Sequence, residues 1–413
     1  MKFRLKYTIA SMAAAAFMST AAMASDLIIT FDDLNPDKKA AYEAAVAAFQ
    51  EANPDINVTA NNGDREAHKD SIRNALQNDA PDVITWYPGN RMGPFVDAGL
   101  FMDISDLWAS DENLSSKFNA IKPTMSRDGK QWGVPYSYYQ WGVYYRKDIY
   151  DKLALTEPGN WEELLGNCDK LTEAGVTPFT IGTQYLWTAA GVFDYLNLRT
   201  NGYDVHNDLT AGKIKYTDDR IRATFGKWEE MLDRCTFVST HATMSWQDAI
   251  APFANGDAAM YVMGNFSVGQ YKDAGLTDEQ IDFFQFPEIT EGLPRAEEAP
   301  ADAFFIPANA KNVENAKKFL SFIATPEIQG EWNKTIGQLP PNSDAEINKD
   351  DKFIVEGMET LSTAAGLAQF YDRDAPAAMA SAGMEGFQKF MLDPSALDEI
   401  LEGLDKVQEE VYK

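Results

Sequence analysis

The sequence has few residues that suit the common kinds of enzyme chemistry. Its 413 residues include two cysteines, Cys168 and Cys235, and three histidines, His68, His206 and His241. The cysteines are not spaced as a metal-binding pair, and the isolated histidines are expected at the surface or at helix caps rather than as general bases. The sequence also lacks the G-x-S-x-G, H-E-x-x-H and P-loop motifs. Nothing in these patterns predicts catalysis, a metal or a cofactor.

Positive charge is also scarce. The chain has 36 lysines and arginines against 63 aspartates and glutamates, which gives a net charge of −27 at pH 7. A field of this sign repels nucleic acid and anionic lipid surfaces. It does not indicate disorder, because 45% of the residues are hydrophobic and 12% are aromatic. We therefore expect a folded protein with an acidic, solubilising surface that binds no nucleic acid.

Only the first 24 residues contain a long apolar stretch. A basic start is followed by an alanine-rich run that ends with small residues at Ala22 and Ala24. This pattern is typical of a secretory signal peptide cleaved after Ala24. A membrane anchor is the alternative, but the run is short and no later segment approaches the ~20 apolar residues that span a bilayer. No cysteine near the cleavage site can carry a lipid, so we expect release into the periplasm.

The two cysteines leave one question open. An exported protein meets an oxidising compartment, which permits a Cys168–Cys235 disulfide. Both residues lie on predicted helices, and two buried free thiols are an equally good interpretation. The sequence does not decide between them.

The fold is predicted to be α/β with two lobes. About 390 residues follow the predicted cleavage site, which is more than one hydrophobic core usually serves. Short apolar runs alternate with helical patterns, as in an α/β sandwich with a largely parallel sheet. Asn35 and Pro36 mark the start of the first helix, as an N-cap and a first helical residue. The first strands are predicted at 26–31, 56–60 and 81–86.

A second α/β set is predicted after residue 145. Asn160 as an N-cap and Gly175 as a stop delimit one helix, and strands are predicted at 177–182, 256–264 and 302–307. The last third is predicted to be wholly helical. Its final helix carries apolar residues on one face: Leu397, Ile400, Leu401, Leu404 and Val407.

The stretch WGVPYSYYQWGVYYRKD (132–148) is unusually rich in aromatic rings. Alternate residues of a strand share one face. The alternation that includes Trp132 and Tyr138 slips between Tyr138 and Tyr139, and Trp141 and Tyr145 follow the other phase. One strand cannot hold both sets on one face, so we infer a break or a crossing between lobes at this point.

Aromatic and amide side chains directly follow several predicted strands. They include Trp86 with Tyr87, Tyr185 with Trp187, Asn265 with Phe266, and Trp246 at the start of a helix. In open α/β sheets, ligands bind beyond the carboxyl ends of the strands. Flat rings cover the C–H faces of a sugar, while Asp, Asn, Gln and Arg side chains bind its hydroxyls. One such ring is ordinary core material, but the repeated placement favours a wall for a sugar.

Segments along nearly the whole chain carry a family resemblance: NDAPDVITW, GLFMDISDL, KQWGVPYSYYQWGVYYRKDIYDKLAL, NWEELLGNCDKL, PFANGDAAMYVMGNF, FFIPANAKNVENAKKFLSFIATPEIQGEWNKTIGQLPPN and AQFYDRDAP. In this order and spacing, the sequence resembles the periplasmic solute-binding proteins of carbohydrate ABC transporters. That extracellular solute-binding family includes the maltose-binding protein.

The resemblance implies two α/β lobes that close around a sugar, without catalysis, in a monomer that docks on a membrane permease pair driven by an ATPase. Hinge crossings are expected near Tyr139–Val143, Met263–Phe266 and Ala324–Glu327. The first lobe would comprise 25–139 and 266–325, and the second would comprise 140–265 and 326–413 with the C-terminal helices.

The resemblance also implies a set of ligand contacts. By position they are Asp32, Asp33, Asp64, Arg65, Trp86, Tyr139, Trp187, Trp246, Asn265, Asp302 and Arg373. The first loop, FDDLNPD, lacks the tryptophan that maltose-binding relatives carry there. This departure puts maltose itself in doubt, and the sequence does not give the sugar, its length or its charge.

Two other functions remain as hypotheses. A secreted glycosidase or lyase would use the neighbouring acids Asp32 and Asp33, or Asp372 and Asp374. A binding protein for iron, a polyamine or a phosphodiester would use the tyrosine cluster or the arginines near strand ends. Adjacent acids are common in so acidic a chain, and adjacency in sequence does not make tyrosines converge.

Overall fold

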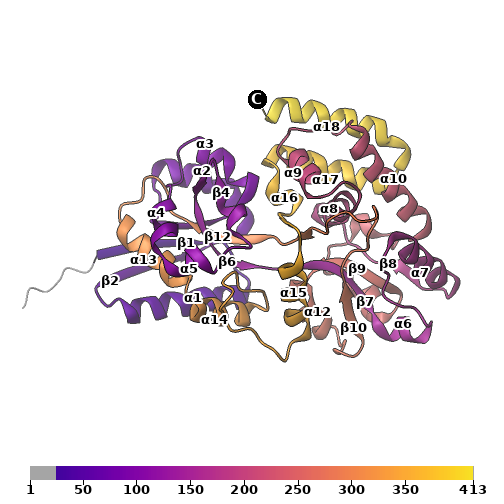
Figure 1. Ribbon diagram of the computed structural model, residues 1–413, viewed down its shortest axis with the longest axis horizontal. Coiled ribbons are helices and arrows are strands. Elements are labelled where there is room, and N and C mark those ends of the chain that lie inside the picture. Colours follow the sequence, from indigo (N-terminus) through magenta and orange to yellow (C-terminus); the bar gives the residue numbers. More distant parts are fainter. Residues whose placement is uncertain (1–24, 413) are drawn as a thin grey trace, which may run out of the picture.

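The computed structural model describes residues 25–412, so the predicted signal peptide and the cleavage site after Ala24 lie outside the described residues. Figure 1 shows two α/β lobes side by side, each built on its own sheet. The predicted α/β class with two lobes is confirmed. Across residues 25–412, no helix combines the length and the apolar character that a bilayer crossing needs.

The first lobe is built on a five-stranded sheet in the order β2-β1-β3-β12-β6. β1 (Ser25–Phe31) pairs in parallel with β2 (Ile56–Asn62) and β3 (Val83–Trp86). β12 (Ala301–Phe305) runs antiparallel to both β3 and β6 (Gly133–Tyr138). The sheet is therefore mixed and the prediction of a largely parallel sheet is wrong, because β12 re-enters this lobe from the second one.

The second lobe contains a four-stranded sheet in the order β10-β7-β9-β8. β7 (Trp141–Arg146) is antiparallel to both of its neighbours, β10 (Ile281–Phe284) and β9 (Ala258–Gly264). In this sheet only β8 (Thr177–Phe179) and β9 are parallel. Alternation of strands and helices predicted parallel pairing, but pairing between strands far apart in the chain sets the direction here.

Helices pack around both sheets (Figure 1). α1 (Pro36–Ala52) begins as predicted, because the Asn35 side chain accepts hydrogen bonds from the first amides of the helix. Asn160 caps α7 (Trp161–Glu173) in the same way. The other helices are α2 (Arg65–Asn78), α3 (Gly93–Asp97), α4 (Ser105–Ser110), α5 (Glu112–Ser116), α6 (Lys147–Lys152), α8 (Trp187–Asn201), α9 (Tyr203–Thr210), α10 (Asp219–Arg234), α11 (Ile250–Asn255), α12 (Val268–Asp273), α13 (Val313–Ile323), α14 (Pro326–Ile336), α15 (Lys352–Thr363), α16 (Tyr371–Asp374), α17 (Ala377–Leu392) and α18 (Leu397–Val411).

The question about the cysteines is answered by a disulfide. Cys168 on α7 bonds to Cys235, which directly follows α10, with 5.0 Å between their Cα atoms. Both residues are buried in the core of the second lobe. The bond joins two helices of one lobe and does not tie the lobes together.

Between β12 and residue 412 the regular structure is helical with one exception. β13 (Leu367–Ala368) pairs in parallel with β11 (Glu297–Glu298), so the prediction of a wholly helical segment is wrong at this point. The final helix, α18, buries Ile400, Leu401 and Leu404 against the second core as its apolar pattern predicts.

The aromatic stretch divides between the lobes where its alternation slips. β6 ends at Tyr138 in the first sheet, and β7 begins at Trp141 in the second. Trp132 packs in the first core with Tyr138, while Tyr139 and Trp141 pack in the second. The change of sheet and of core therefore falls at the position of the predicted crossing.

The two cores give different positions for the other two crossings. Tyr271 and Phe283, which follow residue 266, belong to the second core, because β10 pairs with β7. Trp332 and Leu339, which follow residue 325, belong to the first core, because α14 packs against α1. We therefore propose that the chain returns to the first lobe at 287–298 and leaves it after 339, rather than at 266 and 325.

Candidate ligand-binding site

A cavity of about 490 Å³ lies between residues of the two cores. One side is formed by residues that follow β1, β2 and β3: Asp33, Asn35, Lys38, Arg65, Lys69 and Tyr87. The other side is formed mainly by aromatic residues of the second lobe: Tyr139, Trp141, Trp187, Trp246, Phe266 and Phe370. Gln247, Gln270, Gln338, Asp372 and Arg373 complete the lining. The cavity lies beyond the carboxyl ends of the parallel strands, as expected for such sheets.

The aromatic side is a set of rings in mutual contact. The Trp187 ring lies 6.1 Å from the rings of both Trp141 and Trp246, at interplanar angles of 89° and 66°. Phe266 packs edge-on against Trp246 at 5.4 Å. Such edge-to-face contacts hold each ring at a fixed angle. The wall is therefore pre-shaped rather than assembled around a ligand.

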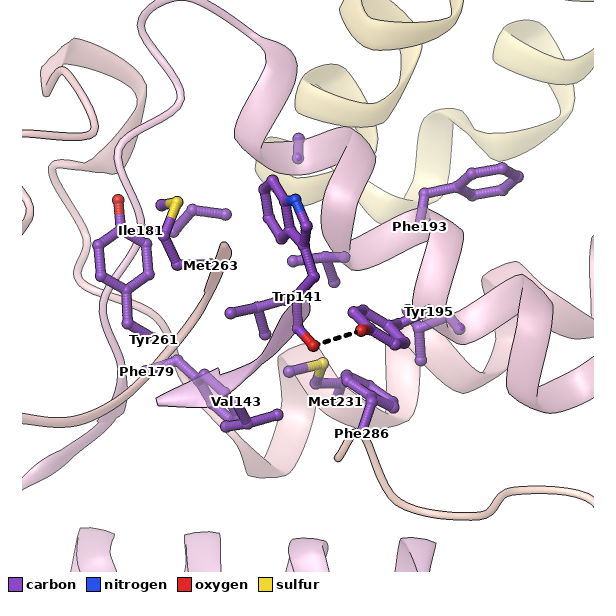
Figure 2. Close-up of a cluster of buried hydrophobic side chains, with 14 of the residues drawn as sticks. Trp141, Val143, Phe179, Ile181, Phe193, Tyr195, Met231, Tyr261, Met263 and Phe286 are labelled. Atoms are coloured by element: carbon purple, nitrogen blue, oxygen red, sulfur yellow. Dashed lines mark hydrogen bonds between the residues drawn. The ribbon is translucent and has the colours of Figure 1, made fainter. Parts of the chain in front are cut away.

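Trp141 anchors this wall in the core of the second lobe. Its side chain is 1% exposed, and its carbonyl accepts a 2.7 Å hydrogen bond from the Tyr195 hydroxyl. Figure 2 shows Trp141 surrounded by core side chains such as Val143 and Phe286. Trp187 and Trp246, in contrast, are only partly buried and present ring surface to the cavity.

The opposite side of the cavity is charged, and Arg65 is at its centre. The guanidinium Nη2 lies 2.9 Å from Asp33, Nη1 lies 3.5 Å from Asp302, and Nε lies 3.7 Å from Asp32. Nη1 also donates a 3.3 Å hydrogen bond to the Tyr87 hydroxyl. Lys38 adds a second cation 2.9 Å from Asp33. These contacts fix the position of each charge without a ligand.

Arg373 continues this charged network from the second lobe. Its Nη1 donates a 3.1 Å hydrogen bond to Asp302, and its guanidinium lies 4.8 Å from the Tyr87 ring and 5.8 Å from the Tyr139 ring. Burial raises the pKa of Asp302, but Arg373 and Arg65 outweigh burial and lower the pKa to about 2. Asp302 is therefore ionised at every physiological pH.

Asp33 is held ionised for the same reason. Burial raises its pKa, but Lys38 and Arg65 outweigh burial, so the net pKa is lowered. A glycosidase needs one carboxyl with a raised pKa as its acid. In the other candidate pair, Asp374 points away from the cavity and accepts hydrogen bonds from Asn90 and Thr210. Of these four acids, Asp33 and Asp372 line the cavity, and each comes from a different pair.

Six of the predicted contacts line the cavity: Asp33, Arg65, Tyr139, Trp187, Trp246 and Arg373. Asp32 and Asp302 are buried one layer behind it and bind the arginines. Asn265 is also buried, and its amide donates to the Gly337 carbonyl. Asp64 is exposed and accepts a hydrogen bond from the Ala67 amide in the first turn of α2.

Trp86 does not form part of the cavity wall. It is 3% exposed and packs against Phe95 and His68 in the first core. The next residue, Tyr87, takes the expected place, because consecutive residues at a strand end point to opposite sides. The prediction therefore named the core ring at this strand end rather than the ring that lines the cavity.

Sequence reasoning did not select several residues of the lining. Tyr87 and Phe266 were named among the rings that follow predicted strands but not among the predicted contacts, and Trp141 lies two residues after the predicted contact Tyr139. Gln338 and Phe370 come from segments far along the chain, and nothing local marks them. Within residues 25–412, no three His, Cys, Asp or Glu side chains form a group suited to a metal ion.

A two-lobed α/β fold with a cavity between its cores defines the class of solute-binding proteins. This chain belongs to the family of bacterial extracellular solute-binding proteins, whose family model matches residues 33–330. It is 27% identical to an ABC transporter extracellular-binding protein of Pyrococcus horikoshii, over 79% of this chain and 74% of the relative. It is 25% identical to the "probable sugar-binding periplasmic protein" of Mesorhizobium japonicum, over 75% of this chain and 76% of the relative.

A solved structure shows the same fold over nearly the whole chain. It is a bacterial solute receptor described as having an exclusive preference for β-D-galactopyranose. The superposition has a TM-score of 0.83 at 25% identity, and it covers 94% of this chain and all of the receptor.

Proposed function

We propose that this protein is the substrate-binding component of a carbohydrate ABC importer. It captures a sugar in the cavity between its lobes and delivers it, unaltered, to a membrane permease pair driven by an ATPase. It acts as a monomer released into the periplasm after cleavage near Ala24. The observation that carries this proposal is one cavity in which an aromatic wall faces a charged side. We call this charged side, formed by Lys38, Asp33, Arg65 and Arg373, the charged floor.

This combination suits a sugar better than other solutes. A sugar ring has a face of C–H groups, which aromatic rings cover, and a rim of hydroxyls that both donate and accept hydrogen bonds. Trp187 and Trp246 offer the ring surface, while Asp33 accepts and Arg65 donates on the opposite side. Relatives in the family with sugar-binding names support the same class of ligand.

Capture follows from the split of the site between two lobes. The ring wall belongs to the second core and most of the charged floor to the first, so a sugar makes all of its contacts only when both sides are close to it. Binding then shifts the population toward the closed arrangement by the difference in affinity between the two states. The permease recognises the closed arrangement, and no bond is made or broken.

A thermal-shift screen over mono- and oligosaccharides and polyols tests this function. A true ligand at a hundredfold excess over its Kd stabilises the folded state by about 2.7 kcal/mol through mass action. Calorimetry then measures the Kd, and chromatography of the incubated sugar checks that it is returned intact. Release of smaller sugars would instead establish the glycosidase hypothesis. A screen in which no carbohydrate raises the Tm would refute the proposal.

A further inference from the structure

The cavity is nearly neutral in a strongly acidic protein. The chain carries a net charge of −27, yet its cavity brings together four cations: Lys38, Arg65, Lys69 and Arg373. Four carboxylates line the same cavity or lie directly behind its lining: Asp32, Asp33, Asp302 and Asp372. Four positive and four negative groups leave no net charge for a ligand to neutralise.

The two arginines are already engaged by these carboxylates. All three nitrogens of the Arg65 guanidinium lie within 3.7 Å of an aspartate oxygen, each from a different aspartate. Arg373 binds Asp302 and lies 3.8 Å from Asp372 through Nε. An arginine that serves an anionic ligand would have to turn away from these partners.

Asp302 makes such a rearrangement costly. It is 4% exposed and is shared by Arg65 and Arg373, which approach it at 3.5 Å and 3.1 Å. A buried carboxylate that loses its cations keeps its charge without compensation, which strongly disfavours that state. Asp302 therefore holds both arginines in place. They can donate N–H hydrogen bonds to a ligand, but their positive charge is already balanced by the carboxylates.

We propose that the site is selective for uncharged sugars and discriminates against uronic acids and sugar phosphates. This inference rests on the proposed function. A neutral hydroxyl both donates and accepts, so one hydroxyl can bind an aspartate and an arginine of the same pair. A ligand carboxylate can only accept, and it would lie in a cavity that Asp33 and Asp372 also line. Like charges in a site closed to water repel, and the repulsion favours the neutral sugar.

The test compares matched neutral and acidic sugars on the full mature chain. Calorimetry would use neutral mono-, di- and trisaccharides, the corresponding uronic acids and the corresponding phosphates. The tightest ligand is expected to be neutral, with its uronic acid weaker by tenfold or more, on the order of one unfavourable charge contact. An acidic sugar that binds as tightly as its neutral counterpart, or more tightly, would overturn the inference while leaving sugar binding intact. Absence of binding by every sugar would refute the proposed function itself.

Removing one carboxylate should shift this selectivity. Asp33→Asn leaves Arg65 and Lys38 with one carboxylate fewer, so the ratio of the Kd values for the uronic acid and the neutral sugar should fall by about tenfold. Asp398→Asn is the control, because that side chain is 78% exposed and pairs with Arg222 on the surface, away from the cavity lining. An unchanged ratio in a folded Asp33→Asn protein would contradict the role given to the carboxylates. Asp302→Asn gives a second, separate measurement of how a carboxylate affects the ratio of these two Kd values.

Discussion

Replacing Glu298 with glutamine should flatten the dependence of stability on pH. Glu298 on β11 and Asp194 on α8 are both 0% exposed. Burial raises the pKa of each carboxyl well above its ordinary value, and the charge of Asp194 raises the pKa of Glu298 further. The raised pKa values favour a shared proton on this buried pair, and Glu298, whose pKa the charge of Asp194 raises, is the carboxyl that we expect to hold it.

The groups that face this pair are acidic, neutral or already engaged in an ion pair. Asp372 on α16 and Glu297 beside it on β11 are acidic, and Glu297 is already paired with Arg199 at 2.6 Å. His206 on α9 lies 3.9 Å from Asp194, but burial lowers its pKa to about 4, so it is neutral at pH 7. The Tyr371 amide donates a 2.9 Å hydrogen bond to Asp194.

The size of the pH effect on the free energy of unfolding follows from counting one proton. In the unfolded chain a glutamate is ionised above its ordinary pKa of about 4.3, so unfolding at neutral pH releases the proton of Glu298. Each pH unit then lowers the free energy of unfolding by about 1.4 kcal/mol, from the ordinary pKa up to the raised one. The contribution of Glu298 is thus complete at acidic pH and is lost as the pH rises. Glu298→Gln has no proton to release, and its amide N–H can take the place of the protonated carboxyl beside Asp194.

Urea unfolding followed by circular dichroism at pH 6, 7 and 8 measures this effect. Relative to the wild-type protein, Glu298→Gln should gain stability as the pH rises from 6 to 8, by up to about 1.4 kcal/mol for each pH unit that lies below the raised pKa. Glu410→Gln, an exposed glutamate on α18, serves as the control and should follow the wild-type curve. Parallel curves for wild type and Glu298→Gln would refute the assignment of a proton to this buried pair.

Four further predictions concern the fold and the cavity. Trp187→Ala should weaken sugar binding about tenfold or more because it removes ring surface from the wall, with only a small fall in Tm. Trp86→Ala should instead cost about 3 to 5 kcal/mol of stability, because that ring lies in the core. Calorimetry measures the Kd and thermal melting measures the Tm of both variants. The reverse pattern would make Trp86 the cavity ring and Trp187 the core ring. Replacing both Cys168 and Cys235 with serine removes a link across 67 residues and should lower the unfolding free energy by about 4 kcal/mol in urea titration, whereas equal stability would show that the bond contributes nothing. Because the pKa of Asp302 is about 2, the Kd for a neutral sugar should be constant from pH 7 down to pH 4, and a loss of affinity over that range would contradict an ionised floor.

Local patterns predicted the local structure well. The caps at Asn35 and Asn160 are side-chain hydrogen bonds that a few residues determine, so the sequence is enough to place them. The slip at Tyr138–Tyr139 was predictable for the same reason, because strand alternation is a property of neighbouring residues.

Long-range pairing was less predictable. β12 pairs with β3 and β6, and β11 pairs with β13, across long stretches of intervening chain. No local pattern states which distant strand a segment joins, or in which direction. For the same reason the positions of the second and third crossings could not be derived from the residues at 266 and 325.

The site was predicted in part because its two sides have different origins. The charged floor follows strand ends in order along the chain, and Asp33 and Arg65 were found there. The aromatic wall draws on distant segments, so Phe370 and Gln338 gave no signal. Trp86 and Tyr87 show the remaining limit, since a shift of one residue at a strand end exchanges a core ring for a cavity ring.

The short link between β6 and β7 has a consequence for engineering. Tyr139 is both a cavity residue and part of the two-residue joint between the sheets. A change made there to retune ligand preference would also alter the angle at which the halves meet. Gln247, which lines the cavity away from any joint, is the safer place to begin a redesign of specificity.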